Sequence, residues 1–379
     1  MEEWINCPLG EILNFRRGHD LPHTEMAGGD IPVAGSNGII GFHNEASPIS
    51  PCITIGRSGN VGIPFMYNRA WAHNTTLYID DFKGNDPLYI FYLLKTLPLS
   101  SFGGGSAVPT LNRNHIHPLI VKHCTNVSVQ RRIASVLKSF DDKIELNNRI
   151  NHNLEEQAQA LYKSWFVDFE PFKGGKFVDS ELGMIPEGWR VAELGTVTRQ
   201  SSQKVKDRID VKVLSPVTTG ELVLSEEYFT KQVFSESISK YIVVKPLHFA
   251  YNPARVNIGS IGMNMFSFDG CVSPVYVVFG CEKGYHHFFD YYRKTASFKD
   301  EVLNRAIGGV RQTLSYKDFA LIKLVYPPYD IVEKFNCIYA GLLENKNSIK
   351  REISKLSELR DTLLPKLLSG ELKIDDFTC

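Results

Sequence analysis

The sequence lacks the features of a secreted or membrane-inserted protein. Its seven cysteines stand singly, with no C-x-x-C pair, and an odd number of scattered cysteines does not indicate a disulfide framework. The chain starts Met-Glu-Glu-Trp, which is acidic where a signal peptide is basic. Its longest apolar runs are strand-sized, far short of the roughly 20 residues that span a bilayer. These absences predict a cytoplasmic protein with no membrane role.

An excess of charge of either sign is also absent. The 379 residues include 42 lysines and arginines and 42 aspartates and glutamates, so the net charge is zero. A global basic field therefore cannot hold a nucleic acid, and such a partner would have to be held by local clusters or by an accessory subunit. The hydrophobic content of 43% suffices for the cores of two ordinary domains.

Motifs for ATP-driven or methyl-transfer chemistry are absent or incomplete. No G-x-x-x-x-G-K-[ST] loop occurs. Tyr326-Pro-Pro-Tyr329 resembles the [Asp/Asn/Ser]-Pro-Pro-[Tyr/Phe] motif of amino-methyltransferases, but its first residue is a tyrosine. Phe102-Gly-Gly-Gly105 lacks the last glycine of the cofactor-loop pattern Phe-x-Gly-x-Gly, because Ser106 takes its place. We therefore expect no catalytic residue, with a single-chain methyltransferase as the alternative.

Candidate sites for metals and phosphates are equally sparse. His115 with His117, and His286 with His287, have no cysteine or carboxylate cluster beside them at ligand spacing. We expect no metal site. The glycine-rich residues 56–62 suit either a phosphate-binding loop or a tight turn between strands.

An internal repeat organises the chain. Trp4 opens a stretch that ends Pro8-Leu-Gly-Glu-Ile12, and Trp189 opens a similar stretch near the middle of the chain. Residues 105–112 are echoed by residues 308–315, and each copy leads into a strand-like run and then a helical pattern. The order is therefore globular, helix, globular, helix.

Each copy of the repeat ends in a long amphipathic helix. Apolar residues recur at alternating spacings of three and four from Leu137 to Trp165, and a matching seam runs from Phe335 to Leu367. Such a seam is typical of a helix that packs against another helix. Ser128 can cap the first helix. About 38 residues at 1.5 Å per residue give a rod of roughly 57 Å.

The connectivity predicts the direction of the two helices. The second globular region leads directly into the second helix, so that helix should begin near the end of the first. We expect an antiparallel pair with the globular domains at opposite ends, related by a pseudo-two-fold axis. A simple helical hairpin that links two domains would show the same seam and remains the plainer alternative.

These observations predict an α+β protein. It has two pseudo-symmetric globular domains with curled or barrel-like sheets, separated by a long antiparallel two-helix coiled coil. The expected parts are a first domain (1–127), a first spacer helix (128–169), a linker (170–185), a second domain (186–328), a second spacer helix (329–370) and a C-terminal tail (371–379).

Four segments of the helices and the linker have the most specific sequences. They are Ile144-Glu-Leu-Asn-Asn-Arg-Ile150, Leu161-Tyr-Lys-Ser-Trp-Phe-Val-Asp-Phe169, Gly183-Met-Ile-Pro-Glu-Gly-Trp189 and Leu359-Arg-Asp-Thr-Leu-Leu-Pro-Lys-Leu-Leu-Ser-Gly-Glu-Leu372. With these segments, essentially the whole chain resembles the specificity subunits of type I restriction-modification systems. In that family the two globular parts are variable target-recognition domains.

The resemblance implies a non-catalytic, DNA-binding subunit of a host-defence complex. Each target-recognition domain would read one half of a bipartite site in double-stranded DNA, and the helices would set the gap. Two modification (methyltransferase) subunits with S-adenosylmethionine would dock on the helices, and two restriction (ATP-dependent translocase/nuclease) subunits would use ATP and Mg. This chain itself would bind no cofactor. A scaffold that has lost DNA reading would look the same in the helices.

Within this interpretation, base contacts need polar side chains on exposed loops, because arginine pairs with guanine and asparagine or glutamine with adenine. The candidates in the first domain are Ser36, Asn37, Arg57, Ser58, Asn60 and Arg113. Those in the second domain are Ser201, Gln203, Lys204, Lys206, Thr218, Thr219, Arg255, Asn257 and Arg311.

Four aromatic residues lie close together at the end of the first helix. They are more than one helical partner can cover, so they are candidate anchors for a modification subunit. The alternative is that they pack the linker against the second domain. The four residues are Trp165, Phe166, Phe169 and Phe172.

Overall fold

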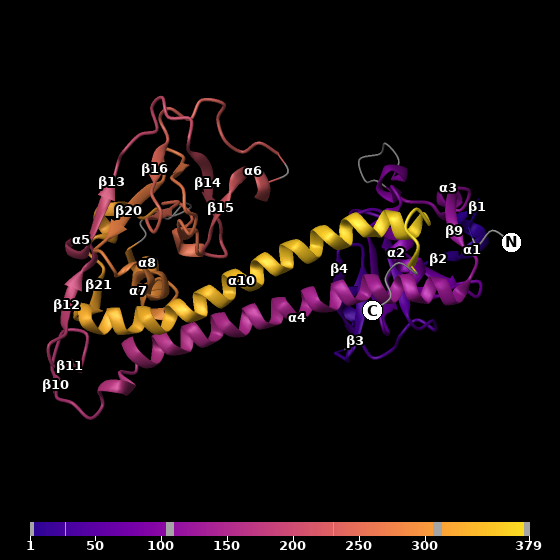
Figure 1. The fold of residues 1–379 in the computed structure, drawn as a ribbon. Helices are drawn as coiled ribbons and strands as arrows, with labels where there is room; N and C mark the ends of the chain where they lie inside the picture. The colour runs from indigo at the N-terminus through magenta and orange to yellow at the C-terminus, as the bar shows by residue number, and fades with distance from the viewer. Residues whose placement is uncertain (1–3, 27, 104–109, 230, 306–312, 375–379) are drawn as a thin grey trace. The chain divides into compact units, whose positions relative to one another are not determined.

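The computed structural model describes residues 4–26, 28–103, 110–229, 231–305 and 313–374 (Figure 1). The chain forms two compact units. Unit 1 consists of residues 1–150 and 348–379, and unit 2 consists of residues 151–347. Two helices of 40 residues, α4 (Val127–Phe166) and α10 (Tyr329–Leu368), each contribute one part to unit 1 and one part to unit 2.

Unit 1 is built from an antiparallel strand pair and two small sheets. The pair is β1–β9, and the sheets have the strand orders β2-β8-β5-β6 and β4-β3-β7. All five residues of β5 are buried, because this apolar strand lies inside its sheet. The elements are β1 (Trp4–Pro8), α1 (Leu9–Ile12), β2 (Asn14–Arg17), η1 (His23–Glu25), β3 (Ile31–Gly35), β4 (Gly38–His43), β5 (Cys52–Gly56), β6 (Pro64–Tyr67), β7 (Trp71–Ala72), β8 (Thr76–Asp81), α2 (Pro87–Thr96), η2 (Leu99–Phe102), α3 (Arg113–Ile116) and β9 (Ile120–Cys124).

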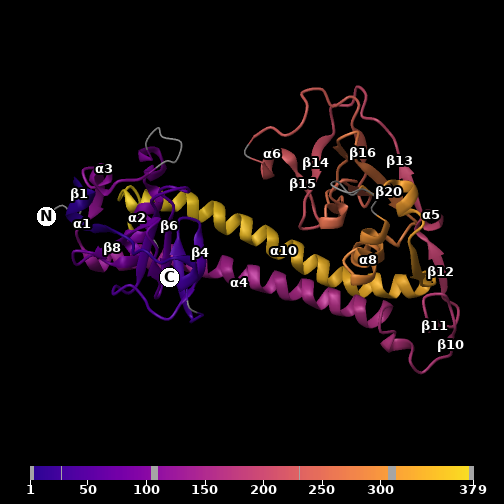
Figure 2. The ribbon, with the colours of Figure 1, turned by 180° about the vertical axis from the view of Figure 1, so that it is seen from behind.

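Unit 2 repeats this plan. The pair β12–β21 corresponds to β1–β9, and the sheets have the orders β13-β20-β17-β18 and β15-β14-β19-β16. Figure 2 shows β12, α5 and β13 following one another along one edge of the unit. The elements are η3 (Glu170–Phe172), β10 (Phe177–Val178), β11 (Ile185–Pro186), β12 (Arg190–Glu193), α5 (Leu194–Val197), β13 (Thr198–Ser201), β14 (Lys212–Pro216), β15 (Leu222–Leu224), α6 (Ser225–Tyr228), β16 (Ile242–Val244), β17 (Phe249–Tyr251), η4 (Val256–Ile258), β18 (Ile261–Met263), β19 (Gly270–Val272), β20 (Val277–Cys281), α7 (His286–Tyr292), α8 (Ala296–Arg305), α9 (Tyr316–Phe319) and β21 (Lys323–Tyr326).

The predicted α+β fold with two related domains and two long helices is confirmed. Every sheet formed by the described strands is open, so neither unit contains the closed barrel that the sequence leaves as one possibility. The domain boundaries drawn from the sequence stay a prediction, since the two compact units divide the chain within both long helices.

Each unit has its own apolar core, to which both long helices contribute. In unit 1, Ile133 and Leu137 of α4 share a core with Leu367 of α10. In unit 2, Tyr162 of α4 packs against Phe335 of α10 at a ring-centroid distance of 6.1 Å. Apolar burial therefore fixes α4 to α10 within each unit.

The N-terminus of α4 is capped by a residue that the sequence analysis does not select. The side-chain oxygen of Asn126 accepts hydrogen bonds from the backbone amides of Ser128 (3.0 Å) and Val129 (3.3 Å). Asn126 is thus the N-cap, and the prediction of Ser128 is wrong by two positions. Within the described residues, no helix is both long enough and apolar enough to cross a bilayer.

Candidate nucleic-acid interface

Two turns lie side by side in unit 1 and contain most of the candidate residues of the first domain, of which Asn37 and Asn60 are exposed and the others half-buried. Ser36 and Asn37 form the two-residue turn between β3 and β4, where Gly35 pairs with Gly38. The second turn, residues 57–63, joins β5 to β6. The carbonyl oxygen of Ser36 lies 3.3 Å from the position that a Cβ atom would take at Gly56. The structure therefore brings Ser36 and Asn37 next to Arg57, Ser58 and Asn60.

Backbone contacts hold the second turn in place. The amide of Arg57 donates to the carbonyl of Thr75 at 2.8 Å, and the amide of Leu111 donates to the carbonyl of Arg57 at 2.7 Å. A Cβ atom at Gly56 would lie 1.7 Å from the carbonyl oxygen of Asn60, so this close turn requires glycine. The glycine-rich segment thus joins two strands, and in it Asn60 is exposed and Arg57 is half-buried.

Unit 2 has the corresponding pair of turns. Thr218 and Thr219 lie in the turn between β14 and β15. The turn after β17 contains Arg255 and Asn257, and the carbonyl oxygen of Thr218 lies 2.7 Å from the position of a Cβ atom at Gly259. Thr218, Thr219 and Arg255 are exposed, and Asn257 is half-buried. The structure therefore gathers four candidate residues of the second domain at one place.

The same backbone contact supports the turn pair in both units. In unit 2 the amide of Leu314 donates to the carbonyl of Pro253 at 3.1 Å, as Leu111 does to Arg57 in unit 1. Leu111 and Leu314 are the equivalent leucines of the internal repeat. Sequence analysis finds this repeated segment but misses its contact partner, because the two sides of the contact are far apart in the chain.

A cavity of about 340 Å³ adjoins the turns of unit 2. Thr218 and Asn257 line it together with Arg293, Lys294 and Lys299. Arg293 is paired with Asp290, and Lys294 with Glu155 and Asp290. Lys299 is exposed and forms no ion pair within the described residues. Lys299 thus adds one unpaired charge to the lining of a cavity that also includes two candidate base-reading residues.

The remaining candidates lie elsewhere or outside the described residues. Arg113 of α3 donates to the carbonyl of Phe15 at 3.2 Å. Ser201 ends β13. Three further candidates lie in the segment that follows, which is joined to β16 because the backbone amide of Val243 donates to the carbonyl of Gln203 at 2.8 Å. These others are Gln203, Lys204 and Lys206, and all three are exposed. Arg311 lies outside the described residues.

The four aromatic residues at the end of α4 pack within unit 2. Phe166 contacts Phe288 and Phe335 at ring-centroid distances of 5.0 and 5.1 Å and is only 6% exposed. Trp189, just before β12, contacts Phe166, Phe169 and Phe172 at 5.1–6.0 Å. The ring of Phe166 therefore packs inside unit 2, as expected if the aromatic residues pack the linker against the second domain. Trp165, Phe169 and Phe172 are only half-buried and stay candidates for docking.

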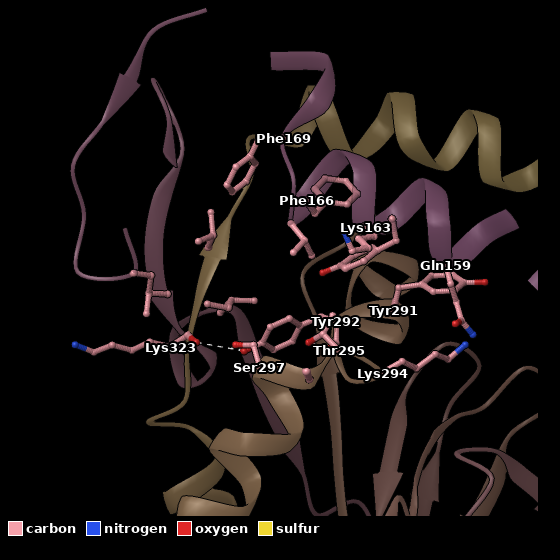
Figure 3. A pocket seen from close by; sticks show the side chains of 16 residues that line it. Gln159, Lys163, Phe166, Phe169, Tyr291, Tyr292, Lys294, Thr295, Ser297 and Lys323 are labelled. Carbon is pink, nitrogen blue, oxygen red and sulfur yellow. Dashed lines mark hydrogen bonds between the residues drawn. The ribbon is translucent and has the colours of Figure 1, made fainter. Parts of the chain in front are cut away.

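An open apolar cavity of about 540 Å³ lies beside these aromatics. Figure 3 shows Phe166 and Phe169 on one side of the cavity and Tyr292 on the other. Tyr292 donates to the carbonyl of Lys323 at 3.2 Å. The cavity therefore has aromatic walls supplied by the end of α4 and by the α7 region, and it is open enough to admit an apolar side chain of another molecule.

The two segments that resemble methyltransferase motifs lie at the ends of secondary-structure elements. Tyr326 ends β21, is buried, donates to Glu282 at 2.6 Å and stacks on Tyr285 at 4.5 Å. Tyr329 begins α10, so the two prolines between these tyrosines lie where a strand changes into a helix. Phe102 ends η2, and the glycines that follow Gly103 lie outside the described residues.

One histidine of each pair has a packing role. His117 accepts a hydrogen bond from the backbone amide of Phe15 at 3.2 Å, and His287 contacts the ring of Tyr339 at 4.7 Å. Burial lowers the pKa of His287 to about 4, which keeps it neutral near pH 7. No group of three or more potential metal ligands occurs within the described residues.

Comparisons with known proteins agree with this architecture. Residues 1–156 match the family model for the type I restriction modification DNA specificity domain. The chain is 28% identical over 303 residues to the type I restriction enzyme MjaIX specificity subunit of Methanocaldococcus jannaschii. This match covers 76% of this chain and 69% of that protein. It is 25% identical over 311 residues to the HindI specificity subunit of Haemophilus influenzae, which covers 64% and 67% respectively.

One solved structure supports the fold. The S subunit of a type I restriction-modification system from M. genitalium superposes with a TM-score of 0.62, at 15% identity and over 96% of both chains. In sequence the chain is therefore similar to specificity subunits of type I restriction enzymes, and its fold is that of a solved S subunit.

Proposed function

We propose that this chain is the DNA-specificity subunit of a type I restriction-modification complex and that each globular domain reads one half of a bipartite DNA site. The observation that carries the proposal is the pair of adjacent turns, each with exposed polar side chains, found at equivalent places in the two units. Both pairs present side chains that hydrogen-bond to base edges. Because the residues differ between the units, with Asn37 and Arg57 in one and Thr219 and Arg255 in the other, the two half-sites differ.

Phosphate contacts of the second domain come from the cavity beside its turns. Lys299 supplies an uncompensated charge there, and Thr218 and Asn257 supply hydrogen-bonding groups. Phosphate contacts position a reader on the duplex, whereas base contacts supply the sequence information. Because the net charge of the chain is zero, we expect other subunits to neutralise further phosphates of the DNA.

The chemistry belongs to the partner subunits in this proposal. Two modification subunits, which carry S-adenosylmethionine and methylate adenine at N6, dock on the long helices. The open aromatic cavity at the end of α4 is the site that best suits an apolar anchor from such a subunit. Two restriction subunits supply ATP- and Mg-dependent translocation and cleavage. The chain itself is non-catalytic, binds no cofactor, and acts in the cytoplasm in host defence.

Methylation mapping tests this function. The chain is expressed in a methylation-free bacterial host, alone and with the methyltransferase encoded beside it, and N6-methyladenine is mapped by long-read sequencing. A split motif that is methylated only when both are present is the expected result. Methylation by the chain alone would instead favour a single-chain methyltransferase, and no methylation in either case would favour a scaffold that does not read DNA.

A further inference from the structure

One carboxylate of α4 joins three groups from other elements of unit 2. Lys294, just after α7, places its Nζ atom 2.8 Å from Glu155 Oε1, and Tyr291 of α7 donates to Glu155 Oε2 at 3.4 Å. Lys346 of α10 pairs with the same Oε2 atom. Burial alone would raise the pKa of Glu155, but the two lysines outweigh it and lower the pKa to about 2. Glu155 therefore ties the domain helix α7 to both long helices.

A carboxylate of the same helix makes the corresponding contacts in unit 1. Tyr92 of α2 donates to Asp141 Oδ2 at 2.8 Å, and Lys95 of α2 lies 3.7 Å from that oxygen. Arg360 of α10 donates to Asp141 Oδ1 at 2.6 Å. Burial opposes the charged form of Asp141 as well, yet hydrogen bonds from Arg360 and Tyr92 lower its pKa. We call each set of four residues a carboxylate cluster.

The two carboxylate clusters follow one pattern. On the domain side, each cluster has a tyrosine and a lysine at the same spacing, in the pattern Tyr-x-x-Lys. The two carboxylates are separated by two heptads on α4, and the two cations by two heptads on α10 in the opposite order. A spacing of whole heptads places the cluster residues of each helix on one face. The same antiparallel register of α4 and α10 therefore occurs in both units.

The charges of the clusters are not duplicated by the internal repeat. Both carboxylates belong to α4, and both long-helix cations belong to α10. The repeat aligns Ile133 of α4 with Phe335 of α10. In that alignment the positions equivalent to the cluster residues are uncharged, namely Leu343 and Ser357 on α10 and Ile144 and Ala158 on α4. A carboxylate cluster therefore forms only where an acidic residue of α4 faces a basic residue of α10 in this register. The tyrosine and the lysine of the domain then contact the same carboxylate.

We propose that Asp141 and Glu155 are positioning residues, each of which holds its recognition domain on the α4–α10 pair in the orientation in which the domain meets its half-site. This inference rests on the proposed function. Apolar contacts such as Tyr291 against Phe335 attach the domain without fixing its direction. Hydrogen bonds to a charged carboxylate are directional and stronger than neutral ones. Loss of the carboxylate relaxes the gap between half-sites, while the bases read within each half stay the same.

Hydrogen exchange of the purified full-length chain tests the attachment without any partner. Glu155→Gln removes the charge in unit 2. The matched control is Glu352→Gln, which removes the Lys143–Glu352 pair (3.5 Å) between the same two helices, a pair that includes no domain side chain within the described residues. Amides of α7 should exchange about tenfold faster in E155Q than in E352Q and in the unmodified chain. Equal exchange of α7 in the two variants would overturn the proposal.

Gap selectivity tests the consequence for DNA reading. Plasmids with the mapped site, and with its gap one base pair shorter or longer, are methylated by each variant together with the methyltransferase encoded beside it. E155Q should raise the ratio of wrong-gap to correct-gap methylation about tenfold with both half-motifs unchanged, and E352Q should not. A uniform loss of methylation at an unchanged ratio would show a purely structural role and overturn the proposal. If the unmodified chain directs no split-motif methylation, the proposed function fails, and hydrogen exchange alone decides the positioning role.

Discussion

Gly370, two residues beyond the end of α10, lies against the indole ring of Trp4 in unit 1. A Cβ atom at Gly370 would lie 2.6 Å from Trp4 Cε2, and the residue has φ = +69°. Both the close approach and the left-handed backbone favour glycine. The contact fixes the chain after α10 to the strand β1.

Replacement of this glycine should therefore destabilise unit 1. Gly370→Ala is expected to lower the free energy of unfolding by about 1–3 kcal/mol, because the ring must shift and the backbone is strained. The control is Gly341→Ala within α10, where a Cβ atom meets nothing within 4 Å. Alanine there should stabilise the helix by about 0.5–1 kcal/mol. Denaturant unfolding measures both, and a loss of equal size in the two variants would contradict the proposed contact.

The carboxylate cluster of unit 2 predicts acid sensitivity. The pKa of Glu155 is about 2 in the folded chain and 4.5 ordinarily, so its contribution to stability is present above about pH 4.5 and is lost as pH falls towards 2. The size is about 3 kcal/mol. E155Q should unfold more easily at pH 7 and show a shallower loss of stability between pH 5 and pH 2, measured by thermal unfolding across pH.

His287 provides an internal reference for that comparison. Its pKa of about 4 lies below its ordinary value of 6.5, so the unfolded chain takes up the proton first and stability falls as pH falls from 6.5 towards 4. This part of the profile should be shared by E155Q and the unmodified chain. Parallel profiles below pH 4.5 would contradict the assigned role of Glu155.

The aromatic core of unit 2 predicts a large cost for removing one ring. Phe335 of α10 is fully buried and contacts Phe166 at a ring-centroid distance of 5.1 Å. Phe335→Ala should lower the free energy of unfolding by about 3–5 kcal/mol, since it leaves a cavity among rigid aromatic neighbours. Ile338 on the same helix is 50% exposed, and Ile338→Ala should cost much less in the same urea titration. Similar losses would mean that α10 does not pack as described.

Much of this architecture can be predicted from the sequence because its signals are local or repeated. The heptad seams run through most of both long helices, and Trp4 and Trp189 open similar stretches of chain, so the sequence predicts the two long helices and the repeat correctly. The N-cap is misplaced because Ser128 and Asn126 are both good capping residues and only the backbone geometry separates them.

The candidate site is predicted less completely, because it depends on contacts between residues far apart in the chain. Asn37 and Asn60 are separate loop residues in the sequence, and only the folded chain places their two turns together. Sequence analysis misses the carboxylate clusters entirely. A search for residue patterns that recur in both domains, such as Tyr-x-x-Lys at Tyr92 and Tyr291, would find their domain side.

The turns of unit 1 predict a defect confined to one half-site. Asn37→Ala should weaken recognition of the half-site read by the first domain by about 1–3 kcal/mol, because an asparagine amide in the hairpin turn offers both a donor and an acceptor to a base. The control is Asn153→Ala on the exposed face of α4. Methylation rates on sites with single-base changes measure the effect. Relaxed specificity in both halves would argue against this assignment of Asn37.

Domain exchange tests the central claim most directly. Residues 1–125 are replaced by the first domain of another specificity subunit, and N6-methyladenine is mapped in cells that also contain the methyltransferase encoded beside the original chain. If each domain recognises its own half-site independently, one half of the methylated motif should change to the donor's half-site while the other half stays the same. A change in both halves, or in neither, would contradict the assignment of one half-site to each domain.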